Sequence, residues 1–298
     1  MRLATDGDPL EADPLSGDRR VVCRDRRTDR SHAARRDISR GSDPEFAMTK
    51  IAIVTPTYNE AENMGELLGQ LEQVCQDMPD VSFTIVVVDD SSPDGTAEVA
   101  RKVSRSVRAA NVAVTVLERQ AKEGVGKAYI DAFQRLLKED FDFFIQIDAD
   151  LSHNPSYIRT MVVESSSGRD FVATSRYMEG GGIHDWNLYR RIISRGGNIY
   201  TRLWLDRRIT DYTNGLNLFS TELLRRVDVN SLDVGGYGFF IELKYRALQH
   251  SHSFMQIPLI LTDRRHGQSK LPKSTIFTNV LLVPRLRLSR DRKSKAGG

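Results

Sequence analysis

Short apolar runs alternate with segments of helical periodicity through the first half of the chain. Each run has the length of a buried strand and ends in a polar loop. The runs cover residues 51–55, 83–88, 112–117 and 143–147. The intervening helices are expected from Asn59, with Glu62 completing a capping box, and over about 97–108 and 125–139. This order predicts an α/β fold with a doubly wound, mostly parallel sheet and helices on both faces.

The second half of the chain alternates less regularly. Short strands are expected at 171–174 and 257–261, and Pro258 favours an edge position for the second of them. Helical spacing places Arg190 and Ser194 on one face of a further helix. Two interpretations of that face remain open: a solvated basic surface, or an anion site in which the planar guanidinium binds phosphate.

The composition indicates a folded protein in a reducing compartment. The chain has 298 residues, a formal net charge of +3 and 40% apolar residues, enough for a substantial core. Cys23 and Cys75 are too few for a disulfide framework. No apolar run reaches the roughly 18 residues that a membrane span needs, so no segment is expected to cross a bilayer by itself.

Residues 1–47 are expected to lie outside the fold. They are rich in Arg and Asp, lack hydrophobic periodicity, and end in a stretch, 41–46, that resembles a cloning scar before Met48. We expect a disordered expression leader, and a natural tail of mixed charge is the alternative. The folded domain is expected over 48–275, and 276–298 forms a separate C-terminal segment.

The C-terminal segment, 276–298, is apolar first and basic afterwards. Apolar residues such as Phe277 and Leu281 precede a run of bases that starts at Arg285. Such a segment can lie on an anionic membrane surface, or it can pack as a core helix with a solvated tail. Pro284 is expected to separate the apolar part from the basic part.

Two carboxylates, Asp148 and Asp150, directly follow the apolar run 143–147. Where a strand gives way to a loop, both side chains can point the same way. Two hard oxygen ligands at this place suit Mg²⁺ or Mn²⁺, with a substrate diphosphate completing the shell. The alternative is a strand that ends in an ordinary polar turn.

Two other loops carry candidate chemistry. Asp90 ends the run 83–88, at the edge where open α/β sheets bind ligands, although a helix N-cap turn is an alternative there. The stretch 122–127 contains glycines but has neither the Walker spacing nor GxGxxG, which excludes both phosphate motifs. Its glycines permit close packing beside a ligand, with Lys122 or Lys127 near a phosphate.

These motifs together resemble a known enzyme family. The stretches 54–60, 88–96 and 148–153 resemble the family 2 inverting glycosyltransferases of GT-A fold. The stretches 175–177, 190–194 and 264–270 narrow this to a resemblance with the soluble dolichol-phosphate mannose synthases that lack transmembrane helices. The resemblance covers nearly all of residues 48–275.

The resemblance implies roles for individual residues. The residues implied in donor binding are Pro56, Tyr58, Glu60, Asp90, Asp148, Ala149, Asp150, Arg264 and Lys270. The implied metal ligands are Asp148, Asp150 and Ser152, the last standing where relatives often have Gln. Arg176, Arg190 and Ser194 would bind the acceptor phosphate. The residues implied in catalysis are Asp150, Arg176, Arg190 and Arg264.

The implied reaction is transfer of mannose from GDP-mannose to dolichyl (polyprenyl) phosphate with inversion, dependent on Mg²⁺ or Mn²⁺. A phosphate acceptor is already ionised near neutral pH and needs no strong base. Asp211 remains a candidate for a base or for an orienting group. Implied partners are an anionic membrane surface and small membrane-anchoring subunits. The implied location is cytoplasmic, peripheral on the cytoplasmic face of a membrane, with a role in protein glycosylation.

Three other functions are weighed against this one. The first is a family 2 enzyme that uses a UDP-sugar and a polyprenyl phosphate or saccharide acceptor. The second is a non-catalytic GT-A subunit that regulates a partner, against which the intact pair Asp148 and Asp150 argues. The third is nucleic-acid binding, which we do not expect because the basic end lacks interleaved aromatic residues and any binding motif.

Overall fold

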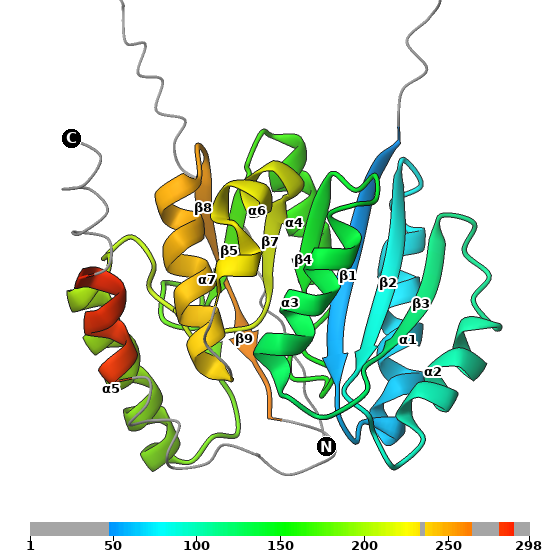
Figure 1. The fold of residues 1–298 in the computed structure, drawn as a ribbon, viewed down its shortest axis with the longest axis horizontal. Helices are drawn as coiled ribbons and strands as arrows, with labels where there is room; N and C mark the ends of the chain where they lie inside the picture. The colour runs from blue at the N-terminus through cyan, green and yellow to red at the C-terminus, as the bar shows by residue number, and fades with distance from the viewer. Residues whose placement is uncertain (1–47, 233–235, 264–279, 289–298) are drawn as a thin grey trace, which may run out of the picture. The chain divides into compact units, whose positions relative to one another are not determined.

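A computed structural model describes residues 48–232, 236–263 and 280–288. Its centre is a seven-stranded sheet with the order β3-β2-β1-β4-β7-β5-β8 (Figure 1). The strands are β1 Thr49–Thr57, β2 Val81–Asp89, β3 Val112–Glu118, β4 Phe143–Gln146, β5 Phe171–Ser175, β7 Asn217–Ser220 and β8 Phe254–Pro258. Only β7 runs antiparallel to its neighbours. The predicted mostly parallel sheet is confirmed, and β8 lies at an edge as Pro258 suggested.

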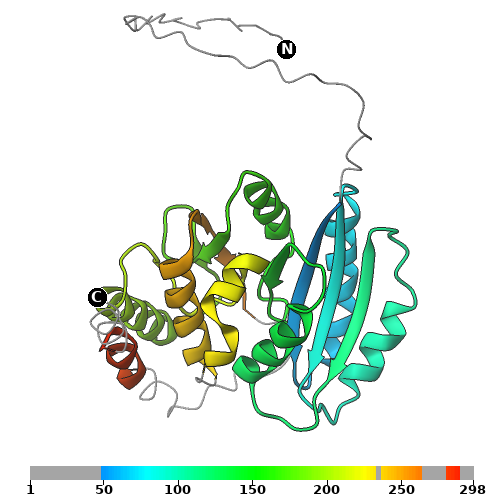
Figure 2. The ribbon, with the colours of Figure 1, turned by 45° about the horizontal axis from the view of Figure 1, so that its top comes forward.

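Helices cover both faces of this sheet (Figures 1 and 2). They are α1 Ala61–Gln76, α2 Thr96–Ser104, α3 Val125–Leu136, α4 Tyr157–Ser166, α5 Leu188–Trp204, α6 Thr221–Val227 and α7 Tyr237–His250. A 3₁₀ turn covers Val229–Ser231, and a small second sheet pairs β6 (Gly182–Ile183) with β9 (Ile260–Leu261). No described helix is both long and apolar enough to cross a bilayer.

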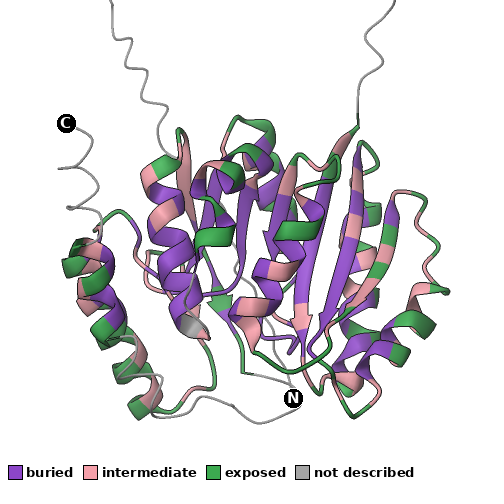
Figure 3. Cartoon of the chain, in the orientation of Figure 1, coloured by how far each residue is buried: buried purple, intermediate pink, exposed green. Residues whose placement is uncertain are grey.

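Alternate residues of β1 face two separate hydrophobic clusters. Ile51 and Ile53 pack with residues of α1, α2 and α4, whereas Ala52 and Val54 pack with residues of α3, α6 and α7. All four side chains are fully buried, as Figure 3 shows for most of the central strands. A strand buried on both faces is expected to read as an unbroken apolar run, which is why these strands were visible in the sequence.

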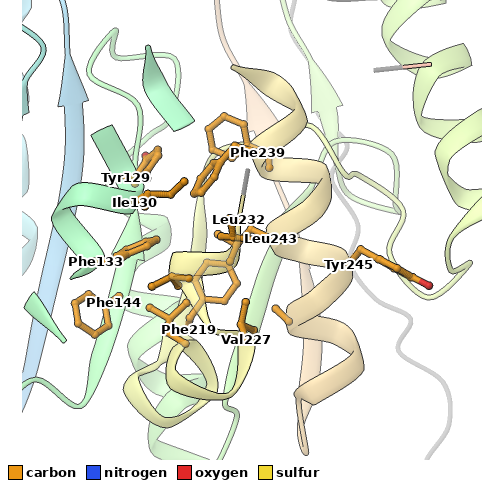
Figure 4. Packing of buried hydrophobic residues seen from close by; sticks show 14 of the residues in the cluster. Tyr129, Ile130, Phe133, Phe144, Phe219, Val227, Leu232, Phe239, Leu243 and Tyr245 are labelled. Atoms are coloured by element: carbon orange, nitrogen blue, oxygen red, sulfur yellow. The ribbon is translucent and has the colours of Figure 1, made fainter. Parts of the chain in front are cut away.

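An aromatic cluster holds α7 against α3 and β4 (Figure 4). The ring of Tyr129 on α3 stacks on Phe239 of α7, with centroids 5.5 Å apart. Phe133 meets Phe144 of β4 edge to face at 5.6 Å. Such contacts add to the burial of apolar area. They fix the position of α7, which carries a buried lysine described below.

The predicted capping box of Asn59 and Glu62 is wrong. The N-cap of α1 is Glu60, it makes no side-chain capping bond, and Asn59 has a left-handed backbone with φ of 56°. The loop after β2 satisfies the backbone N–H groups instead. The acceptors are Ser92 Oγ for Asn59 (3.0 Å), Thr96 Oγ1 for Glu60 (3.0 Å) and Asp94 Oδ2 for Ala61 (3.1 Å).

The described part of the C-terminal segment is a helix, 280–288. The prediction that Pro284 separates two parts is wrong here, because the helix continues through it. Proline has no N–H for the carbonyl of Val280, and the Tyr200 hydroxyl donates to that carbonyl instead, at 2.9 Å. Leu282, Val283 and Leu286 are buried in the core. Residues 276–279 and 289–298, like 1–47, lie outside the described residues.

Candidate active site

The loop after β4 carries the predicted pair of carboxylates. Asp150 is buried, whereas the Asp148 side chain is 37% exposed. Leu151, with φ of 60°, turns the chain so that Asp150 Oδ1 accepts from the backbone N–H of Ser152 at 3.1 Å. The structure therefore brings Asp148, Asp150 and Ser152 into one loop at the carboxyl edge of the parallel strands, where α/β sheets bind ligands.

The oxygen donors of this loop fit a hard divalent cation. In residues 48–232, 236–263 and 280–288, no group of three or more His, Cys, Asp or Glu side chains is placed to hold a metal ion. A cation between Asp148 and Asp150 would therefore need further ligands, such as Ser152, water and substrate phosphates. Mg²⁺ is commonly bound in this way, through one or two carboxylates and phosphate oxygens.

His153 links this loop to the loop before β7. It is 1% exposed, and its Nδ1 accepts from the backbone N–H of Asp148 at 3.3 Å. Because Nδ1 is an acceptor, the proton is assigned to Nε2, which donates to Asn214 Oδ1 at 2.7 Å. Asn214 in turn donates to Thr174 Oγ1 on β5. This chain of bonds fixes the backbone that carries Asp148.

The Asp148 carboxylate lies close to Gly215, which has no side chain. A Cβ atom at Gly215 would lie 2.7 Å from Asp148 Oδ1 and 3.2 Å from its Cγ. Real Cβ atoms do not approach so closely, so any side chain here would displace the carboxylate or the loop. The missing side chain at Gly215 therefore lets the backbone approach the Asp148 carboxylate closely.

Arg176, which follows β5, forms a buried pair with Asp211. Its Nε and Nη2 donate to the two carboxylate oxygens at 2.6 and 2.8 Å. Burial opposes ionisation of Asp211, but the adjacent guanidinium outweighs it and lowers the pKa of that carboxyl to about 2. Such a carboxylate is a weak base. Of the two roles left open for Asp211, the geometry favours orienting Arg176.

Lys244 of α7 contacts the backbone of Asp211 in this pair, and it was not identified as a site residue from the sequence. It is fully buried, and its Nζ donates to the backbone carbonyl of Asp211 at 2.8 Å. Burial lowers the pKa of Lys244 to about 7, against the opposing attraction of Asp211 and Asp148. Lys244 holds the Asp211 backbone and so supports Arg176. Its place within an apolar helical stretch was the only signal for burial.

We predict that Lys244→Met changes how stability depends on pH. Between pH 7 and the ordinary lysine pKa of about 10.4, the folded protein binds fewer protons at Lys244 than the unfolded chain does. Stability from this group therefore rises with pH in that window, by up to about 1.4 kcal/mol per pH unit. The stability of wild type relative to Lys244→Met should rise accordingly.

Urea unfolding of the metal-free protein at several pH values from 7 to 10 measures this effect. Exposed Lys138 is the matched control, and Lys138→Met should track the wild type at every pH. A stability difference between wild type and Lys244→Met that stays constant with pH would contradict the buried, weakly protonated state of this lysine.

The three residues implied in acceptor binding gather around two aromatic rings. The Arg190 guanidinium lies over Trp186, 3.7 Å from the ring centroid. Arg176 lies 5.5 Å from Trp186 and 5.2 Å from Tyr177. The Tyr177 hydroxyl donates to Ser194 Oγ at 2.7 Å. Residues from the chain that follows β5 and from α5 therefore form one cluster of cationic and hydroxyl groups that suits an anion.

Arg264 and Lys270 lie outside the described residues, but the chain that leads to them is placed. The backbone N–H of Thr262 donates to the carbonyl of Ser152 at 3.3 Å. Asp263 pairs with Arg190 at 3.3 Å. Thr262 and Asp263, the last described residues before this stretch, therefore contact the carboxylate loop and the arginine cluster respectively.

The residues implied in nucleoside binding lie after β1 and β2. Lys122 Nζ sits over the Tyr58 ring, 3.6 Å from its centroid. Asp90 is buried, pairs with Arg119, and accepts from the backbone N–H of Gly124 at 2.8 Å. Asp90 therefore anchors the loop that carries Lys122. Its contact with a nucleoside stays a prediction, as do those of Pro56 and Glu60.

Solved structures share this fold. Mannosyl-3-phosphoglycerate synthase from Rubrobacter xylanophilus aligns with a TM-score of 0.56 and 22% identity, over 85% of this chain and 76% of that one. A mycobacterial protein aligns with a TM-score of 0.56 and 19% identity, over 82% and 75%. The sheet and its flanking helices define the GT-A class of glycosyltransferase folds.

The sequence comparisons identify the family. Residues 52–228 match the family model for glycosyl transferase family 2, and the chain belongs to that family. Polyprenol monophosphomannose synthase of Mycolicibacterium smegmatis is 33% identical over 81% of this chain and 89% of its own. Undecaprenyl-phosphate mannosyltransferase of Micrococcus luteus is 32% identical over 79% and 93%. The predicted family and the prediction of a glycosyltransferase enzyme are confirmed.

Proposed function

We propose that this enzyme transfers mannose from GDP-mannose to a polyprenyl phosphate of the dolichyl type, with inversion to a β-mannosyl phosphate. The observation that carries the proposal is the cluster of Arg176, Arg190 and Ser194, which suits a phosphate acceptor. The cluster is connected to the carboxylate loop through Thr262, which bonds to Ser152, and Asp263, which pairs with Arg190. The names of the mycobacterial and Micrococcus relatives, which refer to polyprenyl phosphates and mannose, support the same acceptor and sugar.

The acceptor half of the reaction needs positioning more than a base. The second pKa of a phosphate monoester is about 6, so its oxygen is already a nucleophile near neutral pH. Arg176 and Arg190 hold this phosphate, and Asp211 fixes the Arg176 guanidinium. A phosphate oxygen attacks C1 of the sugar as the bond from C1 to the donor diphosphate breaks. The bonding electron pair leaves with the diphosphate.

The donor half of the reaction needs neutralisation of the diphosphate. Asp148 and Asp150, with Ser152, would hold Mg²⁺ or Mn²⁺, which supplies a Lewis acid beside the leaving phosphates. Arg264 and Lys270 are proposed to add positive charge from the stretch after β9. The residues proposed to hold the rest of the donor are Pro56, Tyr58, Glu60, Asp90 and Ala149.

The proposed acceptor also suggests a location. A polyprenyl phosphate presents its phosphate at a bilayer surface, so the enzyme has to work at a membrane face. We propose the cytoplasmic face, with the protein held peripherally.

We predict that Arg190→Ala weakens acceptor binding more than donor binding. Arg190 on α5 stands over Trp186 in the acceptor cluster, whereas the residues implied in nucleoside binding follow β1 and β2. The acceptor KM should rise about tenfold or more, the loss expected for one charge-assisted contact. The donor KM should change little.

Steady-state kinetics with each substrate varied in turn measures the effect. Arg207→Ala removes an exposed arginine just beyond α5 and is the matched control. A raised donor KM with an unchanged acceptor KM would reverse the assignment of Arg190.

A panel of nucleotide sugars tests the proposed donor. GDP-mannose, GDP-glucose, UDP-glucose and UDP-N-acetylglucosamine are each supplied with a polyprenyl phosphate and, separately, with a saccharide acceptor. We expect GDP-mannose and the lipid phosphate to be the preferred pair of substrates. Preference for a UDP-sugar, or for the saccharide, would replace the proposal with the alternative family 2 activity.

A further inference from the structure

Helix α5 has its amphipathic pattern reversed relative to an ordinary surface helix. Its buried residues are the polar Asn198 and Thr201. The exposed large apolar residues of α5 are Leu188, Tyr189, Ile192, Ile193, Ile199, Leu203 and Trp204. A surface helix normally turns its apolar stripe toward the core. Figure 3 shows α5 largely exposed, and these apolar residues are among its exposed positions.

The helix 280–288 extends this apolar surface. The Tyr200 hydroxyl of α5 contacts the carbonyl of Val280, and the two helices lie side by side in Figures 1 and 2. Val280, Leu281 and Leu288 are exposed, with Leu281 at 62%. We call these residues, together with the exposed apolar residues of α5, the α5 face. Exposed apolar residues gathered on two adjoining helices in this way mark an interaction surface.

The charges on these two helices select the kind of partner. Arg191 and Arg195 of α5 are exposed, as is Arg285 on the second helix. Neither Leu188–Trp204 nor the stretch 280–288 contains an acidic residue. A second copy of the chain packed on this face would bring like charges together, whereas anionic lipid headgroups would attract them. Tyr189 and Trp204 are residue types that favour the membrane interface.

We infer that the α5 face inserts shallowly into an anionic bilayer and so brings the arginine cluster to the level of the lipid headgroups. Arg190 and Ser194 lie on the same helix as the inserted residues. A lipid phosphate would then reach them without leaving the membrane surface. The identity of the acceptor rests on the proposed function, but the membrane contact itself does not.

Vesicle binding tests the inserted residues. The variant Ile192→Ser/Leu203→Ser removes two exposed apolar side chains outside the arginine cluster, and Val163→Ser on α4, 57% exposed, is the matched control. On vesicles of equal parts phosphatidylglycerol and phosphatidylcholine, the double variant should bind about tenfold or more weakly. The control should sediment like the wild type. Equal binding by all three proteins would overturn the inference.

Tryptophan fluorescence tests the same face by a second route. The chain has two tryptophans, so Trp186→Phe leaves Trp204 of α5 as the reporter. Trp204 emission should shift to the blue on anionic vesicles and be quenched by brominated lipids. Vesicle binding without quenching would place the contact elsewhere and overturn the inference.

Activity separates this inference from the proposed function. With a short-chain polyprenyl phosphate in solution, the double variant should match the wild type, and with a long-chain acceptor in vesicles its KM should rise. If the enzyme uses no lipid phosphate but vesicle binding follows the pattern above, the proposed function is wrong and the inferred contact of the α5 face with the membrane is supported. If the double variant instead turns a dimer into a monomer and still binds vesicles, the α5 face contacts a second copy and the inference is wrong.

Discussion

Asp150→Asn is expected to abolish sugar transfer while the protein stays folded. Asn has nearly the shape of Asp and keeps an oxygen for the Ser152 N–H that Asp150 Oδ1 accepts at 3.1 Å. It loses the negative charge that would hold a divalent cation beside the leaving diphosphate. Transfer should fall below about a tenth of the wild-type rate, because neutralisation of the diphosphate charge by the cation is the main electrostatic contribution proposed for the site.

The measurements are the transfer rate and Mn²⁺-dependent donor binding by calorimetry, and both should be lost. Asp77→Asn is the control, since Asp77 is 53% exposed in a surface pair with Arg159, and such pairs contribute little. Activity above about a tenth of wild type in Asp150→Asn would end the metal-ligand role assigned to Asp150.

Gly215→Ala should cost about hundredfold in rate, the effect of a displacement of roughly 1 Å in an active-site group. The new Cβ would lie 2.7 Å from Asp148 Oδ1, so the carboxylate or the loop has to move. The apparent affinity for the divalent cation should fall as well. Kinetics at varied Mn²⁺ concentration measures both effects.

The control for this variant is Gly69→Ala on α1, where an added Cβ meets nothing within 4 Å. It should keep full activity and gain up to about 1 kcal/mol in stability from helix propensity. If Gly215→Ala were as active as Gly69→Ala, then the placement of Asp148 would not depend on the close approach of Gly215.

The parallel sheet and the carboxylate loop were visible in the sequence for a physical reason. Strands such as β1 are buried on both faces, so their apolar runs are unbroken. Asp148 and Asp150 stand out because they directly follow such a run, at the edge where α/β sheets bind ligands. Both signals are local along the chain.

The rest of the site depends on contacts that are distant in sequence. His153 and Asn214 are 61 residues apart, and Lys244 lies 33 residues from the Asp211 carbonyl that it binds. Nothing in the sequence near either partner specifies these pairs. Strand β7, with four residues, was also too short to reveal that it runs antiparallel between β4 and β5.

The two incorrect predictions, the capping box of α1 and the break at Pro284, also result from contacts that are distant in sequence. At the start of α1 the expected local cap is replaced by acceptors from the loop after β2, and at Pro284 the missing donor is replaced by the Tyr200 hydroxyl. In α5 the periodicity predicts a helix with distinct faces but not which face is buried. Tertiary contacts decide all three, so the sequence pattern alone could not.

Mannosyl transfer can be measured by incubating the full chain with GDP-mannose and a polyprenyl phosphate in anionic vesicles, with Mn²⁺ or with a chelator. The product is separated as lipid-linked sugar, and its anomeric configuration is determined by NMR. We predict that one GDP is released per mannosyl phosphate lipid formed, that the product is β-linked, and that no product forms with the chelator. An α-linked product, undiminished transfer with the chelator, or GDP release without a mannosylated lipid would contradict the proposed function.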